Sequence, residues 1–256
     1  HADSYRKIRN TFRYLLGNLN DDFQKIDMES LDIKQLPELE RYMLHRVYEL
    51  NNNFKNYFKS YDFHNLYKEL LNFCTVDLSS FYFDIRKDAL YCDSKDSDRR
   101  KSSIVVLNII LESLVKWFAP ILSFTTEEIF TLINKEQKSI HLEQFMKYPE
   151  SFQDEELHKK WIELKKIRDI CNISIEAKRA SKEIGSSLEA SLIINLNKSL
   201  FEISKNVDFS EICITSSALV HQSNTDETII ETIKAEGNKC PVCWKINKVK
   251  CERHSD

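Results

Sequence analysis

The sequence predicts a mostly α-helical protein that ends in a small metal-bound module, and three observations support this. The 256 residues contain only 3 glycines and 4 prolines, against average usage of about 7% and 5%. Chains so poor in turn-forming residues are typical of helical folds. Apolar residues recur at helical spacing over most of the first 150 positions. The last twenty residues hold three cysteines and one histidine in a tight pattern.

Residues 1–150 predict an antiparallel helical bundle. Apolar periodicity indicates long helices over about 4–19, 37–58, 62–85 and 104–118. Pro120 should end or kink the fourth helix. Thr125, with Glu128 three residues later, then predicts a capped start for a short helix. Four long amphipathic segments joined by short polar links are typical of such a bundle.

Residues 151–236 predict a long helix followed by a small α/β element. A lysine-rich helical pattern extends from Asp154 to Lys182, and Gly185 then interrupts it. Residues 190–196 and 209–215 both resemble strands, with a short helical piece near Leu200 between them.

Residues 237–256 predict a structural zinc knuckle. Two pairs with two residues between their members, Cys240 with Cys243 and Cys251 with His254, are separated by seven residues. Such pairs can bring four ligands to one tetrahedral zinc ion. So small a module has almost no apolar core, and we therefore expect the metal to supply its folding energy. Four protein ligands leave no open position for a substrate.

Composition argues against several classes of protein. The three glycines are too far apart for a dinucleotide-binding or phosphate-binding loop. No nucleophile and base recur in a catalytic pattern, so a hydrolase or redox enzyme has no support and we predict no catalytic residue. Seven cysteines without a paired framework, and no apolar run long enough for a membrane span, predict a reduced, cytoplasmic protein. The formal net charge of −3 means that any nucleic-acid contact needs a local basic patch.

Two features are candidates for such a contact. Arg6, Arg9 and Arg13 lie away from the apolar stripe of the first predicted helix. They form either a solvated face or a set of phosphate contacts, since guanidinium groups match phosphate oxygens. Trp244 directly follows a predicted zinc ligand and precedes Lys245. Its ring either covers the metal site or offers a stacking surface to an unpaired base.

Several stretches resemble one known family. Residues 4–19 (SYRKIRNTFRYLLGNL) closely resemble the start of the anticodon-binding helical domain of bacterial isoleucyl-tRNA synthetases. Residues 61–64 (YDFH), 117–125 (WFAPILSFT), 184–190 (IGSSLEA) and 239–244 (KCPVCW) match further family stretches, in the same order. The resemblance therefore extends over the whole chain.

This resemblance implies the tRNA-binding C-terminal portion of a longer enzyme, without its catalytic and editing domains. The full-length family members attach isoleucine to tRNA(Ile) using ATP, so ATP and magnesium would act only through the absent domain. The family's HIGH and KMSKS motifs do not occur here. By resemblance, Arg6, Arg9 and Arg13 would contact the backbone of the anticodon arm, and Trp244, with Lys245 beside it, would stack on an anticodon base.

The chain departs from the family at two places in the knuckle. Val242 stands where many members carry arginine, and Cys251 with His254 replaces a second Cys-x-x-Cys after a longer loop. We expect a monomer. The alternative function is a helical protein-interaction module that is derived from a synthetase but does not bind tRNA.

Overall fold

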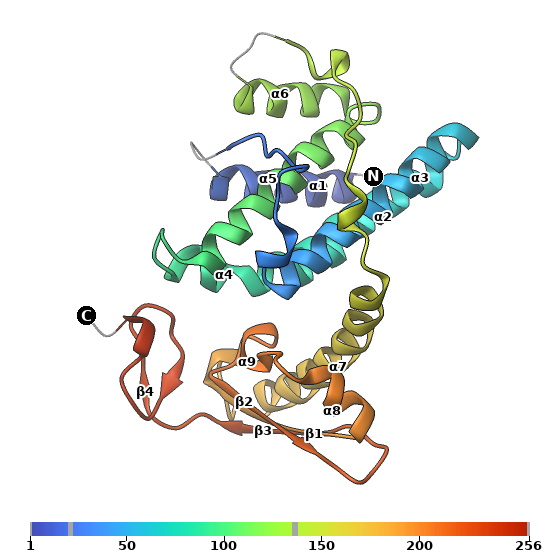
Figure 1. Cartoon of the computed structure of the whole chain (residues 1–256). Coiled ribbons are helices and arrows are strands. Elements are labelled where there is room, and N and C mark those ends of the chain that lie inside the picture. Colours follow the sequence, from blue (N-terminus) through green and yellow to red (C-terminus); the bar gives the residue numbers. More distant parts are fainter. Residues whose placement is uncertain (1, 20–22, 135–137, 255–256) are drawn as a thin grey trace. The chain divides into compact units, whose positions relative to one another are not determined.

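The computed structural model describes residues 2–19, 23–134 and 138–254 (Figure 1). The chain divides into two compact units, His1–Glu155 and Glu156–Asp256. The first unit is built from helices, and the second adds a small mixed sheet. The predicted fold class, a mostly helical bundle followed by a small α/β element, is therefore confirmed. The finer division into 1–150, 151–236 and 237–256 stays a prediction.

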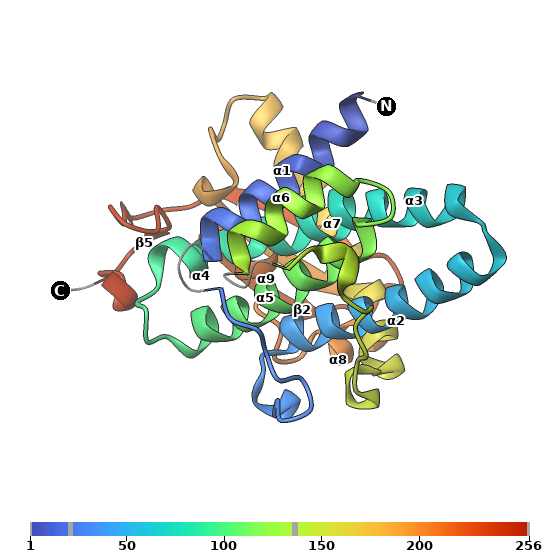
Figure 2. The same cartoon turned by 90° about the horizontal axis from the view of Figure 1, so that it is seen from above.

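The first unit consists of packed helices, and its described connections include the longer segments 23–37 and 138–154, which contain short 3-10 turns. α1 and α6 both lie alongside α5 (Figure 2). The Tyr5 hydroxyl of α1 also meets the Thr125 hydroxyl of α6 at 3.0 Å. The elements are α1 (Ala2–Leu19), α2 (Glu38–Ser60), α3 (Phe63–Asn72), the π-helical segment Phe73–Tyr82, α4 (Phe83–Cys92), α5 (Asp98–Phe118) and α6 (Ser123–Ile133).

The predicted apolar stripe of α1 is buried. Ile8, Phe12, Leu15 and Leu19 are each at most 1% exposed, and α1 packs on α5 and on the π-helical segment. The Phe12 ring meets the Phe118 ring edge to face, with centroids 6.0 Å apart. One face of α1 is therefore fixed in the core, which leaves the opposite face to solvent.

The start of α6 differs from the prediction. Thr125 is not its N-cap, because the helix already begins at Ser123. After Pro120 the chain makes a tight turn in which the amides of Ile121 and Leu122 both donate to the Phe118 carbonyl. This turn returns the backbone to helical geometry two residues before Thr125.

A buried ion pair joins three helices of the first unit. Both oxygens of the Glu40 carboxylate (α2) accept hydrogen bonds from the Arg86 guanidinium (α4), each at 2.6 Å. The Tyr82 hydroxyl and the Ser103 hydroxyl of α5 donate to the same carboxylate at 3.2 Å. All four residues are at most 2% exposed. A buried charge without a partner is strongly destabilising, so this network constrains how α2, α4 and α5 can pack.

The second unit consists of the long helix α7 (Glu155–Ala180), a three-stranded sheet and a terminal hairpin. The strand order is β2-β1-β3, with β2 parallel and β3 antiparallel to β1. The strands are β1 (Ala190–Leu196), β2 (Ser217–Gln222) and β3 (Ile229–Lys234), followed by the hairpin strands β4 (Asn238–Lys239) and β5 (Ile246–Asn247). The predicted strand at 190–196 is confirmed, as is the helical piece near Leu200, which is α8 (Lys198–Ser204).

The predicted strand at 209–215 is wrong. Phe209–Ile212 forms a short helix, α9, because the Asp208 carboxylate accepts from the amides of Ser210 and Glu211 at 2.8 and 3.3 Å. This side chain caps the helix start. The apolar residues Phe209, Ile212 and Cys213 are still buried. The hydrophobic pattern therefore predicted their burial correctly, but it predicted a strand where the chain forms a helix.

No helix in the described part of the chain is both long and apolar enough to cross a membrane.

Replacing one partner of the buried ion pair tests its role in the bundle. We expect Arg86→Met to lower the free energy of unfolding by about 3–5 kcal/mol, because Glu40 would remain buried and charged. The matched control is Lys87→Met, whose ammonium forms a half-exposed pair with Asp84 and should change the stability by less than about 1 kcal/mol. The double variant Glu40→Leu/Arg86→Met should recover much of the loss. Equal denaturant midpoints for the two single variants would contradict this role.

Candidate nucleic-acid interface and metal centre

Arg6, Arg9 and Arg13 all lie on the exposed face of α1. Within residues 2–19, 23–134 and 138–254, no ion pair involves any of the three, whereas the neighbouring Lys7 pairs with Asp3 at 3.1 Å. We call the surface formed by these three residues the arginine ridge. Its guanidinium groups are free to meet an anionic ligand, and their fork geometry suits phosphate.

Four side chains of the second unit bring their ligand atoms together. One ligand atom each from Cys240, Cys243, Cys251 and His254 lies within 4.8 Å of all the others. The Nδ1 atom of His254 is 3.5 Å from Cys240 Sγ and 3.4 Å from Cys251 Sγ, and the Sγ atoms of Cys243 and Cys251 are 3.9 Å apart. Tetrahedral coordination with bonds of about 2.3 Å to sulfur and 2.0 Å to nitrogen places neighbouring ligand atoms about 3.5–3.8 Å apart. The cluster therefore fits one metal ion.

The terminal hairpin brings these ligands together. The Cys240 amide donates to the Lys245 carbonyl at 2.9 Å, and the Trp244 amide donates to the Cys240 carbonyl at 3.1 Å. Gly237 has φ of +130°, and a Cβ built there would lie 2.2 Å from the Asn247 carbonyl oxygen. Only glycine fits this close approach at the base of the hairpin.

The hairpin is also attached to the sheet of its own unit. The Ile246 amide donates to the Ser216 hydroxyl at 2.6 Å, and this hydroxyl donates to the Leu188 carbonyl. Ser216 directly precedes β2, so the metal cluster is positioned by the fold of the second unit as well as by its own ligands.

The thiols of the cluster differ in acidity. Burial opposes ionisation of Cys240, but hydrogen bonds from the amides of Cys243 and Val242, and from the side chains of Cys243 and His254, lower its pKa to about 6. Burial raises the pKa of the Cys243 thiol to about 11. Metals bind the thiolate form, so a cation at this position would displace the Cys243 proton.

Trp244 adopts a backbone conformation that is rare for a large side chain. Its φ is +63°, in the left-handed region that favours glycine. The side chain is 58% exposed, and Lys239 Nζ lies 5.3 Å from its ring centroid. Most of the ring is therefore open to solvent.

Lys245 makes a hydrogen bond that the sequence did not predict. Its ammonium group donates to the Ser210 hydroxyl of α9 at 3.2 Å, so this side chain also helps to attach the hairpin to the second unit. Sequence reasoning did not identify the roles of Gly237 and Ser216, because each depends on residues brought together only by folding.

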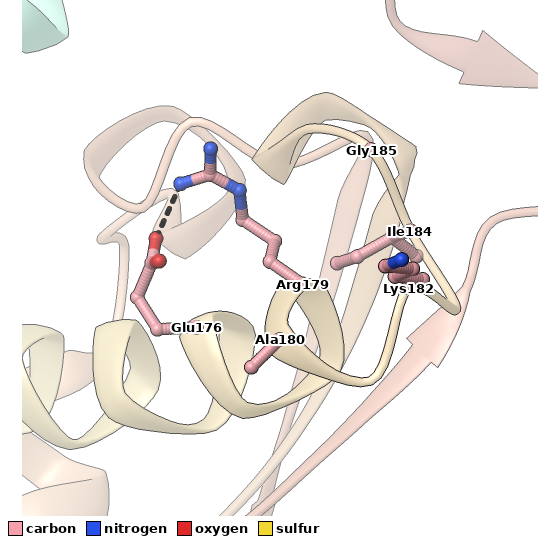
Figure 3. A pocket seen from close by; sticks show the side chains of 6 residues that line it. All are labelled: Glu176, Arg179, Ala180, Lys182, Ile184 and Gly185. Atoms are coloured by element: carbon pink, nitrogen blue, oxygen red, sulfur yellow. Dashed lines mark hydrogen bonds and ion pairs between the residues drawn. The ribbon is translucent and has the colours of Figure 1, made fainter.

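A separate hollow lies at the end of α7 (Figure 3). It has a volume of about 480 Å³ and is lined by Glu176, Arg179, Ala180, Lys182, Ile184 and Gly185. Glu176 accepts from Arg179 at 2.6 Å, so the arginine is already neutralised by an acidic neighbour. No residue predicted from the sequence to bind RNA or metal lies in this hollow.

The class of the protein follows from comparison with known families. The family described as "Anticodon-binding domain of tRNA ligase" matches residues 40–194, from the start of α2 into β1 and more than half of the chain. The chain therefore belongs to this family. The match includes neither the arginine ridge nor the metal cluster.

Individual relatives narrow the class further. The chain is 98% identical over 256 residues to an isoleucine–tRNA ligase of Pelagibacter ubique (strain HTCC1062), covering all of this chain and 28% of the relative. It is 40% identical to that of Bartonella henselae and 38% identical to that of Agrobacterium fabrum, each over 96% of this chain and 26% of the relative. The predicted resemblance to isoleucyl-tRNA synthetases is confirmed. The chain spans only about a quarter of the length of these ligases.

Metal content tests the cluster directly. We expect the purified chain to carry about one metal ion and Cys240→Ser to lose it, because three remaining ligands bind far more weakly. The matched control is Cys92→Ser, which lies outside the cluster and should keep the ion. Elemental analysis gives the content and identity of the metal, and far-ultraviolet circular dichroism should show the helices unchanged. A wild-type chain that binds no added metal would contradict the assignment.

Proposed function

We propose that this chain binds the anticodon arm of tRNA(Ile) as part of an isoleucine–tRNA ligase. The full-length protein would attach isoleucine to tRNA(Ile) using ATP and magnesium in its other domains, and this portion alone would be inactive. The observation that carries the proposal is the arginine ridge, three exposed guanidinium groups without acidic partners among the described residues, in a chain of the anticodon-binding family.

The arginine ridge suits the RNA backbone. Phosphate contacts dominate the affinity of proteins for nucleic acids and position the partner without reading its sequence. Arg6, Arg9 and Arg13 repeat at about one turn of α1, so one strand could meet them in succession. Because the chain as a whole carries a net charge of −3, attraction of an RNA backbone has to come from a local group of cations such as this one.

Trp244 suits an unpaired base. Aromatic side chains that stack on splayed bases are the usual means of recognising single-stranded RNA loops. The exposed ring and the nearby Lys239 ammonium combine a stacking surface with positive charge. We assign Lys245 a supporting role, because its contact with Ser210 holds the hairpin that carries Trp244.

We propose that the metal is one structural zinc ion. Three thiolates and one imidazole in a tetrahedral arrangement are typical of zinc, and all four positions belong to the protein. Cys240, Cys243, Cys251 and His254 would then hold the hairpin closed around Trp244. Zinc chemistry here supplies folding energy rather than catalysis. The cytoplasmic location, the monomeric state and the three-part domain division are further parts of this proposal.

Removing one guanidinium group tests the arginine ridge. We expect Arg9→Ala to weaken binding of tRNA(Ile) and to lower the slope of log K against log[salt] by about 0.7–0.9, as expected for one lost phosphate contact. The melting temperature should not change, because the side chain is exposed. Fluorescence anisotropy across a salt series measures the slope.

The matched control is Lys205→Ala, an exposed cation already paired with Glu202, which should leave the slope unchanged. Equal losses of affinity and melting temperature would make Arg9 structural. A wild-type chain whose RNA binding is absent at low salt would support the protein-interaction module instead.

A further inference from the structure

A tyrosine of another helix lies beside the last turn of α1. Asn18, in the last turn of α1, donates from Nδ2 to the Tyr91 hydroxyl of α4 at 3.3 Å. The same amide donates to the Tyr14 carbonyl at 2.8 Å, which fixes its orientation. The Tyr91 side chain is nevertheless 63% exposed. Its hydroxyl end is therefore held while its ring remains open to solvent.

Aromatic packing sets the position of α4 beside α1. The Tyr14 ring stacks on the Phe83 ring with centroids 4.3 Å apart and an interplanar angle of 18°. The Tyr14 hydroxyl also donates to the Phe83 carbonyl at 3.3 Å. Tyr91 follows Phe83 by about two turns of α4, so its location relative to α1 is fixed by the core and not by its own weak contact with Asn18.

One exposed position of α1, one turn after Arg13, has no side chain. Gly17 occupies this position, and a Cβ built there would meet no atom within 4 Å. Nothing in the described fold requires glycine here, and glycine inside a helix is less favourable than alanine by about 0.5–1 kcal/mol. The missing side chain leaves room for a ligand to lie against the helix.

The carboxylates of α4 and of the residue that follows it are paired with cations. Two carboxylates of α4 are paired with cations, Asp84 with Lys87 and Asp88 with Arg99, both at 2.9 Å. Asp93, just after α4, is also paired with Arg99, at 2.8 Å. Because Arg99 serves both Asp88 and Asp93, these groups together keep one net negative charge, and the arginine ridge would have to supply the attraction for phosphate.

We propose that Tyr91, beside the last turn of the helix that carries the arginine ridge, is a stacking platform for an unpaired nucleotide of the tRNA. This inference rests on the proposed function and extends it. The ridge holds the phosphates, the strand passes over Gly17, and the next base stacks on the Tyr91 ring. A base in a duplex is already stacked on both faces, so the nucleotide belongs to a loop or a bulge.

Three variants of the full 256-residue chain test this inference against fluorescein-labelled tRNA(Ile). Tyr91→Leu removes the ring and should weaken binding about 5- to 150-fold, the range for loss of one base–aromatic stack. The salt slope should not change, because no cation is lost. Tyr91→Phe keeps the ring and should retain most of the affinity. Gly17→Gln fills the bare surface and should weaken binding while the melting temperature stays the same or rises.

The outcomes separate the inference from the proposed function. If Arg9→Ala weakens binding but Tyr91→Leu and Gly17→Gln change it less than twofold, only the inference is overturned. If Tyr91→Leu lowers the melting temperature while the folded protein keeps its affinity, Tyr91 merely joins α1 to α4 and the inference is overturned. If the wild-type chain does not bind the RNA at low salt, both are overturned.

Discussion

The buried pair between Glu40 and Arg86 is the interaction on which the first unit depends. Two charges at most 2% exposed can stay ionised only if each finds its partner in good geometry. The Tyr82 and Ser103 hydroxyls complete the coordination of the carboxylate, so α2, α4, α5 and the π-helical segment have one compatible arrangement. α1 packs on two of these elements. The arginine ridge consequently lies on a helix whose supporting core is rigid.

The terminal hairpin has no apolar core to make it rigid. Its strands contain only two residues each, too few to be stable alone. The glycine at position 237 and the hydrogen bond to Ser216 hold the hairpin, and the proposed zinc ion would replace the missing apolar packing. This arrangement holds Trp244 with a left-handed backbone and an exposed ring. Unfavourable backbone conformations that persist in a constrained site are typical of functional positions.

The sequence predicted those features that depend on neighbours along the chain. Helical periodicity located α1 and its exposed arginines, and ligand spacing located the metal cluster. Features that depend on distant residues were not predictable: Tyr91 meets Asn18 across 73 positions, and Arg86 meets Glu40 across 46. The apolar residues at 209–213 were compatible with a strand or a buried helix, and one capping aspartate decided between them. β2 and β3 were not predicted. They are edge strands whose residues are mostly exposed, so they lack a clear apolar pattern.

Hydroxyl-radical footprinting of tRNA(Ile) tests most directly whether the arginine ridge binds the backbone of a folded RNA. With the metal-bound chain at low salt, the phosphates protected from hydroxyl radicals should lie in the anticodon arm. The triple variant Arg6→Ala/Arg9→Ala/Arg13→Ala should lose this protection although its helices remain folded. Protection confined to the acceptor end, or a triple variant with an unchanged pattern, would contradict the role given to the ridge.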